Sequence, residues 1–318
     1  MRTYLLSTSA LAGAALLSSA ALADVSISGA VEFEYSDSDS NIATNDTKGM
    51  ASNNEVYIDF TNKTDSGLTI VYNVDIDGDA GAGIDDNSLS ISGGFGKLVM
   101  GQTDGVSDTM AITAQGLIAE ETDGTATGGT VLKDSGATTT GNGDRVSFTL
   151  PAMGGLTAGV SYKEADTASV TEYGINYTME AAGTTITVGH TGSTQEVASA
   201  QDNDTTNTGI TVGMGAVSFT VSNGTSESAG EDLSGNGVGA KYTLANGLTL
   251  AAATFKSEDD IDTGEEYSVN HYEAIYPIAS GLTAVVTVSD FDYEGGTSGN
   301  GGADENGTIT SLTMKASF

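Results

Sequence analysis

The side chains best placed to do chemistry in this sequence are carboxylates, and they gather in one long stretch, residues 103–144. Its acidic residues are Asp104, Asp108, Glu120, Glu121, Asp123, Asp134 and Asp144. The only base among them is Lys133. Carboxylates gathered in this way favour cations. A connection this long is rare unless it has a function, although a solvated external loop is the alternative.

A second acidic group could bind a metal ion. Asp75, Asp77 and Asp79 alternate with other residues, as carboxylates do at the start of a calcium-binding loop. The glycine expected at the sixth position of such a loop is Ala80, and the twelfth position is Asp86 rather than Glu. The sequence therefore allows a calcium site here, with an ordinary solvated loop as the alternative reading.

The composition excludes several other classes of site. The chain has 318 residues, with 43 acidic and 10 basic side chains, a net charge of −33, no cysteine and 2 histidines. Disulfide scaffolds, zinc–thiolate centres and cysteine nucleophiles are therefore excluded. The acidic balance argues against nucleic-acid binding, which needs clustered lysine and arginine. No nucleophile elbow or phosphate-binding loop is present, and His190 and His271 lie far apart, so we expect no enzyme activity.

The first 23 residues are expected to be a targeting segment rather than part of the fold. Arg2 supplies a positive start, an apolar run follows, and Ala21 to Ala23 has the small-residue pattern of a cleavage site. A short membrane anchor is the less favoured alternative. We therefore divide the chain into a signal peptide, residues 1–23, and a single domain, residues 24–318.

The elements that must position these side chains are β-strands. Val25, Ile27, Val31 and Phe33 alternate with polar or small residues, and the same period of two returns throughout the domain. About sixteen such runs begin near residues 24, 53, 68, 86, 97, 145, 156, 170, 184, 207, 216, 237, 248, 266, 282 and 306. Each run has one apolar face and one polar face.

The lengths of the connections alternate as well. Short ones, such as 64–67 and 180–183, follow long ones, such as 37–52, 103–144 and 223–236. Short turns on one side and long loops on the other are typical of a transmembrane β-barrel, whose apolar face meets lipid. Tyr35, Tyr72, Tyr162, Tyr242 and Tyr276 have the outward parity expected of aromatic girdles. A soluble β-sandwich is the alternative architecture.

Several segments together resemble the general porins of Gram-negative outer membranes, most closely the alphaproteobacterial porins of the Rhodobacter type. They are the start Ala23–Gly29, the run Gly94–Gly101, the repeated Gly-Leu-Thr joints and the terminal Phe318. The resemblance implies an antiparallel barrel of sixteen strands, a homotrimer and one water-filled pore per subunit for ions and small hydrophilic solutes. It implies contact with outer-membrane lipid and lipopolysaccharide, and recognition of Phe318 by the barrel-assembly machinery.

The resemblance also implies that the third external loop folds into the pore, and residues 103–144 occupy that place. The apolar middle of this loop, residues 110–119, could pack against the barrel wall. General porins set basic side chains across the pore from the loop acids, and by parity Arg145 and Lys241 are our candidates for that wall. Lys63, Lys97, Lys163 and Lys315 also have inward parity. Because bases are so few, we expect a cation-preferring pore without a required cofactor.

Two other functions fit parts of the sequence. A secreted acidic adhesin or surface-layer protein would explain the richness in Gly, Thr, Asn and Asp. An outer-membrane enzyme in a smaller barrel would require clustered His, Ser and Asp at the external rim, and that pattern is not found. The porin reading is preferred because it explains the alternation and the loop lengths together.

Overall fold

The computed structural model describes residues 24–42, 44–78, 83–120, 132–133, 143–165, 168–197, 201–228, 231–261, 264–295 and 304–318. The expected signal peptide lies outside these residues, as do Asp79, Glu121, Asp123 and Asp134. No helix among the described residues is long and apolar enough to cross a membrane.

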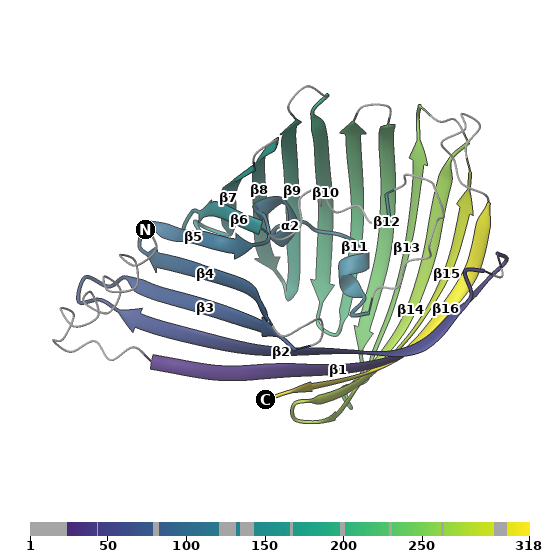
Figure 1. Cartoon of the computed structure of the whole chain (residues 1–318), viewed down its shortest axis with the longest axis horizontal. Coiled ribbons are helices and arrows are strands. Elements are labelled where there is room, and N and C mark those ends of the chain that lie inside the picture. Colours follow the sequence, from purple (N-terminus) through teal and green to yellow (C-terminus); the bar gives the residue numbers. More distant parts are fainter. Residues whose placement is uncertain are drawn as a thin grey trace, which may run out of the picture.

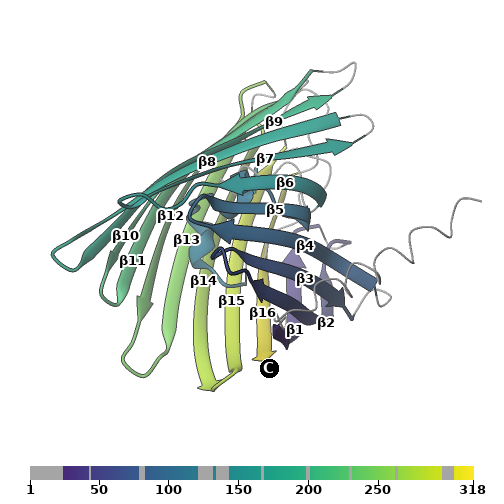
Figure 2. The same cartoon turned by 90° about the vertical axis from the view of Figure 1, so that its left-hand side faces the viewer.

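The described residues form sixteen strands in one closed antiparallel barrel (Figures 1 and 2). The strands are β1 (Asp24–Ser40), β2 (Thr47–Lys63), β3 (Thr69–Asp77), β4 (Gly83–Gly93), β5 (Gly96–Thr103), β6 (Gly143–Thr149), β7 (Leu156–Ala165), β8 (Ala168–Ala181), β9 (Thr184–Val197), β10 (Asn203–Met214), β11 (Val217–Ser228), β12 (Glu231–Thr243), β13 (Thr249–Asp259), β14 (Glu266–Ala279), β15 (Leu282–Glu294) and β16 (Glu305–Ser317). Each strand pairs with its sequence neighbours, and β1 closes the barrel on β16. The expected all-β barrel is confirmed.

The two ends of the barrel differ. We call one the short-turn end, because tight turns join β2–β3, β4–β5 and β8–β9 there and Phe318 lies there. We call the other the loop end, because the connection between β5 and β6 leaves the wall there. The backbone of Phe318 exchanges hydrogen bonds of 3.0 and 3.3 Å with Gly29 on β1, which extends the closing strand pair to the last residue.

The prediction of long loops at residues 37–52 and 223–236 is wrong, because the strands continue through most of both segments. β1 runs to Ser40 and β2 begins at Thr47, so most of residues 37–52 is paired. Likewise β11 and β12 pair through residues predicted as the loop 223–236, where Asn223 lies opposite Asn236. Both faces of these segments are polar or small, so no alternation marks them, although the backbone hydrogen bonds persist.

The outward face is apolar where the alternation predicted it. Val25, Ile27, Phe33 and Val146 are exposed on it. The five tyrosines proposed for aromatic girdles are also exposed at outward positions. His190 also lies outward, because it shares the outward face of β9 with Val188. There its ring nitrogens contact the hydroxyls of Tyr173 and Thr208 at 3.2 and 2.8 Å.

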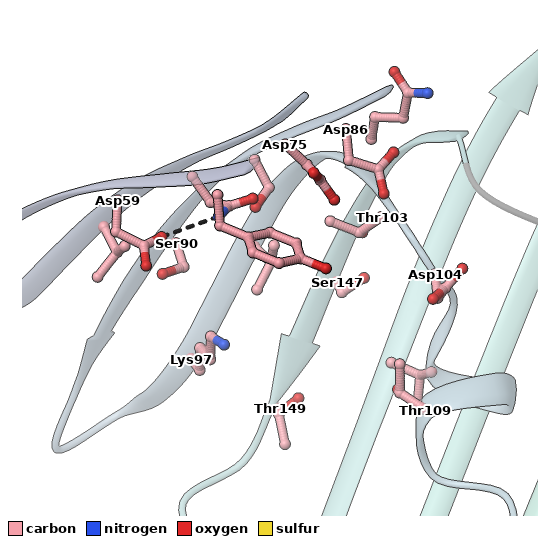
Figure 3. Close-up of a pocket in the computed structure, with 17 residues that line it drawn as sticks. Asp59, Asp75, Asp86, Ser90, Lys97, Thr103, Asp104, Thr109, Ser147 and Thr149 are labelled. Atoms are coloured by element: carbon pink, nitrogen blue, oxygen red, sulfur yellow. Dashed lines mark hydrogen bonds between the residues drawn. The ribbon is translucent and has the colours of Figure 1, made fainter. Parts of the chain in front are cut away.

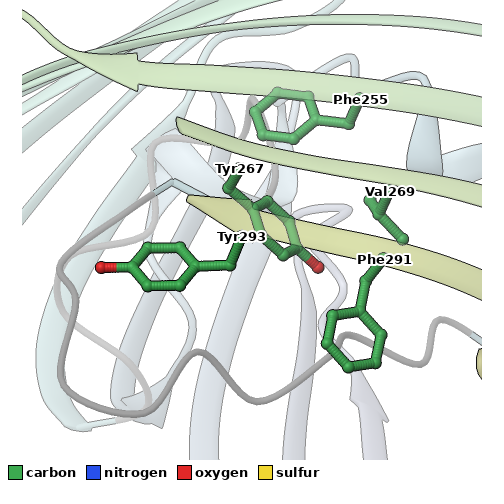
Figure 4. Close-up of a cluster of buried hydrophobic side chains, with 5 residues drawn as sticks. All are labelled: Phe255, Tyr267, Val269, Phe291 and Tyr293. Atoms are coloured by element: carbon green, nitrogen blue, oxygen red, sulfur yellow. The ribbon is translucent and has the colours of Figure 1, made fainter. Parts of the chain in front are cut away.

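An apolar cluster fills the inward side of β13–β15 (Figure 4). It consists of Phe255, Tyr267, Val269, Phe291 and Tyr293, all buried. The partly buried Leu132, which lies within the connection between β5 and β6, packs against this cluster. Its carbonyl accepts a 2.7 Å hydrogen bond from the Ser257 hydroxyl. This sector of the barrel interior is therefore occupied by side chains.

The described first half of the β5–β6 loop turns into the barrel (Figure 1). We call residues 104–120 the inward segment. It contains the single-turn helix α2 (Val106–Thr109) and the 3₁₀ turn η1 (Gln115–Leu117). Val106, Ala114, Leu117 and Ile118 are buried, as expected for an apolar middle that packs against the wall.

Candidate pore constriction

The inward segment is held at its root by a buried ion pair. The Nη1 of Arg145 on β6 lies 2.7 Å from the Oε2 of Glu172 on β8, and both side chains are almost fully buried. The Ser107 hydroxyl donates to the other carboxylate oxygen at 2.8 Å, and the Ser161 hydroxyl also donates to Glu172. The backbone N–H of Val106 donates to Ser161 at 3.0 Å. Wall charge and loop backbone thus form one network.

The middle of the segment is pinned by wall amides and hydroxyls. The side chain of Asn207 on β10 accepts from the N–H of Ile112 at 3.2 Å and donates to its carbonyl at 3.3 Å. The Ser222 hydroxyl on β11 accepts from the N–H of Ala114 at 3.0 Å. These bonds satisfy backbone groups that would otherwise be buried unpaired, a loss of about 1–3 kcal/mol each.

Glycines on the wall let the segment approach closely. The lumen-facing glycines beside it are Gly159, Gly174, Gly189, Gly209, Gly237 and Gly239. A β-carbon on Gly209 would overlap the carbonyl of Ile112 and lie 2.7 Å from its Cβ. A β-carbon on Gly174 would lie 2.9 Å from the Met110 sulfur. The wall is therefore smooth where the segment lies.

The tip of the segment is held by a third wall group, Glu273 on β14. Its carboxylate accepts from the N–H of Ala119 at 2.9 and 3.0 Å and from the N–H of Glu120 at 2.8 Å. The Thr287 hydroxyl donates to the same carboxylate at 3.2 Å. The side chain of Glu120 then forms an ion pair with Lys315 on β16, which also lies 3.3 Å from Glu32.

The surroundings of Glu120 change its acidity. Burial raises the pKa of its carboxyl, because removing the carboxylate from water disfavours the charged form. The ion pair with Lys315 opposes this effect without cancelling it. Glu120 therefore takes up a proton at a higher pH than an ordinary glutamate.

Across from the α2 end of the inward segment lies a cavity of about 680 Å³ (Figure 3). Its charged lining residues are Asp59, Asp75, Asp86, Lys97 and Asp104. Tyr57, Asn73, Gln102 and several threonines and serines complete the lining. The lining thus has four carboxylates against one ammonium. Residues of β2–β6 and of the inward segment enclose this cavity.

The predicted constriction residues fall into different places. Asp104 lines the cavity, Asp108 lies exposed on α2, and Glu120 lies at the tip of the segment. Glu121 and Asp123 lie outside the described residues. Arg145 and Lys241 are both inward, as parity predicted, and Arg145 pairs with the wall residue Glu172. Among the described residues, the wall base Lys315 pairs with the loop acid Glu120. The roles of Arg145 and Lys241 as partners of the loop acids stay predictions.

The proposed calcium loop stays a prediction, because Asp79 lies outside the described residues. Asp75 and Asp77 lie on the lumen face of β3, and the β3–β4 pairing continues to Asp77 and Gly83. Among the described residues, no group of three or more His, Asp or Glu could hold a metal ion.

Sequence reasoning missed Glu172 and Glu273. Both have inward parity on strands, which was available as a signal, but parity does not indicate which inward acid will meet the loop. The row of inward glycines on neighbouring strands was a second available signal. Glycine weakens a strand interior, so several of them on one face suggest that another backbone approaches there.

Comparisons with known proteins agree with this geometry. The family model described as Gram-negative porin matches residues 7–296. No relative of curated function matches the chain in sequence. The structure is similar to a loop-deletion mutant of OmpT, an outer membrane protein of Vibrio cholerae, with 14% identity, a TM-score of 0.72 and coverage of 93% of this chain and 99% of that one.

Two further solved structures are similar in fold. One is an anion-selective porin from Comamonas acidovorans, with 12% identity, a TM-score of 0.71 and coverage of 93% and 100%. The other is the trimer form of in-vitro folded OmpT from Vibrio cholerae, with 13% identity, a TM-score of 0.70 and coverage of 93% and 99%. At these identities the likeness concerns the fold alone.

Proposed function

We propose that this chain, which belongs to the Gram-negative porin family, forms a water-filled channel for passive diffusion of ions and small hydrophilic solutes, and that the channel prefers cations. Membership of the family supports a pore in the outer membrane with long loops outside and short turns in the periplasm. We also propose that the chain belongs to the Rhodobacter-type porins within this family.

The cavity beside the inward segment is the observation that carries this proposal. Its polar lining suits hydrated solutes, and its four carboxylates outnumber the single lysine. Low-dielectric walls focus such charge into the aqueous path and raise the local concentration of counter-ions. The ion pair between Glu120 and Lys315 leaves the excess of lumen carboxylates in place.

The remaining features of the proposal follow from the family and the sequence. We propose residues 1–23 as a cleaved signal peptide, residues 24–318 as the barrel and residues 103–144 as the constriction loop. A homotrimer, contact with lipopolysaccharide and recognition of Phe318 by the assembly machinery belong to it as well. Passive diffusion requires no cofactor and no catalytic group, so no enzyme activity is included.

The deciding experiment is a planar-bilayer recording on detergent-purified protein, with the reversal potential measured across a KCl gradient. We expect step conductances grouped in threes and a potential that favours potassium. Asp59→Asn combined with Asp104→Asn should shift the potential toward zero, whereas the outward Asp37→Asn is the matched control.

The possible contrary results differ in meaning. A potential that favours chloride would leave the pore and overturn the cation preference. Folded protein without conductance would overturn the channel itself. A chain that is soluble without detergent would instead support the acidic adhesin or surface-layer protein, which the barrel and family do not favour.

A further inference from the structure

The inward lysines are not spread evenly along the pore. Lys63 is the last residue of β2, Lys97 is the second residue of β5, and Lys241 and Lys315 lie two residues before the ends of β12 and β16. All four of these positions are at the short-turn end. Within the described residues, Lys63, Lys97 and Lys241 make no ion pair, whereas Lys315 pairs with Glu120 and Glu32.

The orientation of these lysines follows from their neighbours. Lys97 lines the cavity, and Lys63 shares its face of β2 with the cavity-lining Tyr57 and Asp59. Lys241 shares its face of β12 with Gly239, which lies against Ala114 of the inward segment. The lysines therefore surround the periplasmic mouth from different sides of the barrel.

Most inward carboxylates of this part of the wall lie toward the other end. Glu55 shares the inward face of β2 with Lys63 and is about 27 Å from it along the strand, at roughly 3.4 Å per residue. Asp104 follows the loop end of β5, on which Lys97 marks the short-turn end. Asp75 and Asp86 line the loop-end part of the same cavity (Figure 3). Along this path, the fixed charge becomes more negative from the periplasmic mouth outward.

Four residues depart from this order. Asp24 and Asp59 are inward in the short-turn half of β1 and β2, because Asp24 lies opposite the inward Thr61 and Asp59 lines the cavity. Lys163 is inward near the loop end of β7, and Glu180 is inward near the short-turn end of β8. Arg145 adds no net charge to the loop-end half, because it is buried against Glu172. The carboxylates Asp24, Asp59 and Glu180 offset the charge of Lys63, Lys97 and Lys241. The short-turn half is therefore close to neutral, whereas the loop-end half stays acidic.

A pore whose fixed charge changes from an acidic end to an end where lysines balance the carboxylates conducts unequally in the two directions. When the acidic end is at the positive potential, cations enter through the carboxylates and anions through the lysines, so both carriers accumulate inside. When the polarity is reversed, both carriers leave the interior and the pore is depleted of ions. The effect requires that the Debye length be comparable to the width of the pore. The Debye length is about 10 Å at 0.1 M salt and about 3 Å at 1 M.

We propose that this porin rectifies: it passes more current when its external side is positive than when its periplasmic side is positive. The lysine collar, Lys63, Lys97 and Lys241, and the carboxylates Glu55, Asp75, Asp86 and Asp104 are the residues that produce the asymmetry. This inference rests on the proposed channel function and adds a direction to it.

The test is the single-channel current–voltage curve in symmetric KCl. The orientation of each channel is found with Ile261→Cys, a unique cysteine in the exposed loop between β13 and β14, biotinylated and detected by streptavidin added to one chamber. We expect the ratio of currents at opposite voltages to exceed one at about 0.1 M KCl and to approach one at about 1 M. The triple variant K63Q, K97Q, K241Q should lower the ratio toward one at the lower salt concentration. The outward Lys256→Gln, which removes one positive charge from the outer face, should leave the ratio unchanged.

Each other result would overturn the proposal in a recognisable way. A linear curve at about 0.1 M, or a larger current with the periplasmic side positive, would refute rectification while the channel function stands. Rectification that persists in the triple variant would remove the role of the collar. The absence of any conductance would instead be the failure of the proposed function.

Discussion

At the scale of single residues, one acid of the inward segment connects the loop to the far wall. Glu120 is positioned through its own backbone N–H on Glu273, and its side chain pairs with Lys315. Since burial raises the pKa of Glu120, this carboxyl gains a proton before ordinary glutamates do as the pH falls. Protonation removes one negative charge from the constriction and leaves Lys315 with Glu32 alone.

This predicts a pH-dependent selectivity. As the pH is lowered, the cation preference should begin to fall above the usual range of glutamate titration, because the charged form of Glu120 is lost there. Glu120→Gln should have the lower preference already at neutral pH and should show no change in that upper window. Reversal potentials of both proteins from pH 7.5 to 4.5 check the prediction, with the outward Glu227→Gln as control. Identical curves for wild type and Glu120→Gln would contradict it.

For single residues, the sequence predicts which charged side chains point inward, but it does not predict which acid pairs with which base. Parity correctly placed Arg145, Lys241 and Lys315 inward, because a charge on the lipid face costs about 2–4 kcal/mol at the midplane. Which inward acid meets which base depends on the path of the inward segment across the wall. That path depends on strand register and tilt, which the alternation does not encode, and so Glu172 and Glu273 were not identified.

At the scale of elements, strand alternation was informative only where one face is apolar. The strands were located well in the lipid-facing band, where Val, Ile and Phe alternate with polar residues. Above the band both faces are polar, so the alternation assigns Asn223 and Asn236 to a loop although they pair. Backbone hydrogen bonds, which every residue type can make, hold that region together.

The closeness of the inward segment to the wall is also a property of elements, because it depends on glycines of neighbouring strands. Gly209→Ala should push Ile112 toward the lumen at a cost of about 1–3 kcal/mol of overpacking. The bore should then narrow, and single-channel conductance should fall. Gly213→Ala is the matched control: it lies on the same face of β10, and the nearest atom to its added β-carbon is 3.9 Å away. Equal conductance in the two variants would show that the glycines do not determine the bore.

At the scale of the whole molecule, the net charge of −33 could act in two ways. Carboxylates on the outer rim attract cations from a distance, whereas those of the lumen act on the ion inside the pore. The two contributions differ in their response to substitution, because only the lumen carboxylates line the confined path. The sequence charge alone could not separate them, since it does not say which acids face the cavity.

Solute flux through liposomes separates the two contributions. In a swelling assay we expect glucosamine to enter faster than gluconate of similar size, and the ratio to shrink as the salt rises and the Debye length falls from about 10 Å at 0.1 M to about 3 Å at 1 M. The lumen variant with Asp59→Asn and Asp104→Asn should lose most of the difference, whereas Asp37→Asn with Asp39→Asn, which removes as much charge from the outward face of β1, should retain it. If the two double variants lose the difference equally, the selectivity would arise from the overall surface field, and the cavity would be only the path and not the filter.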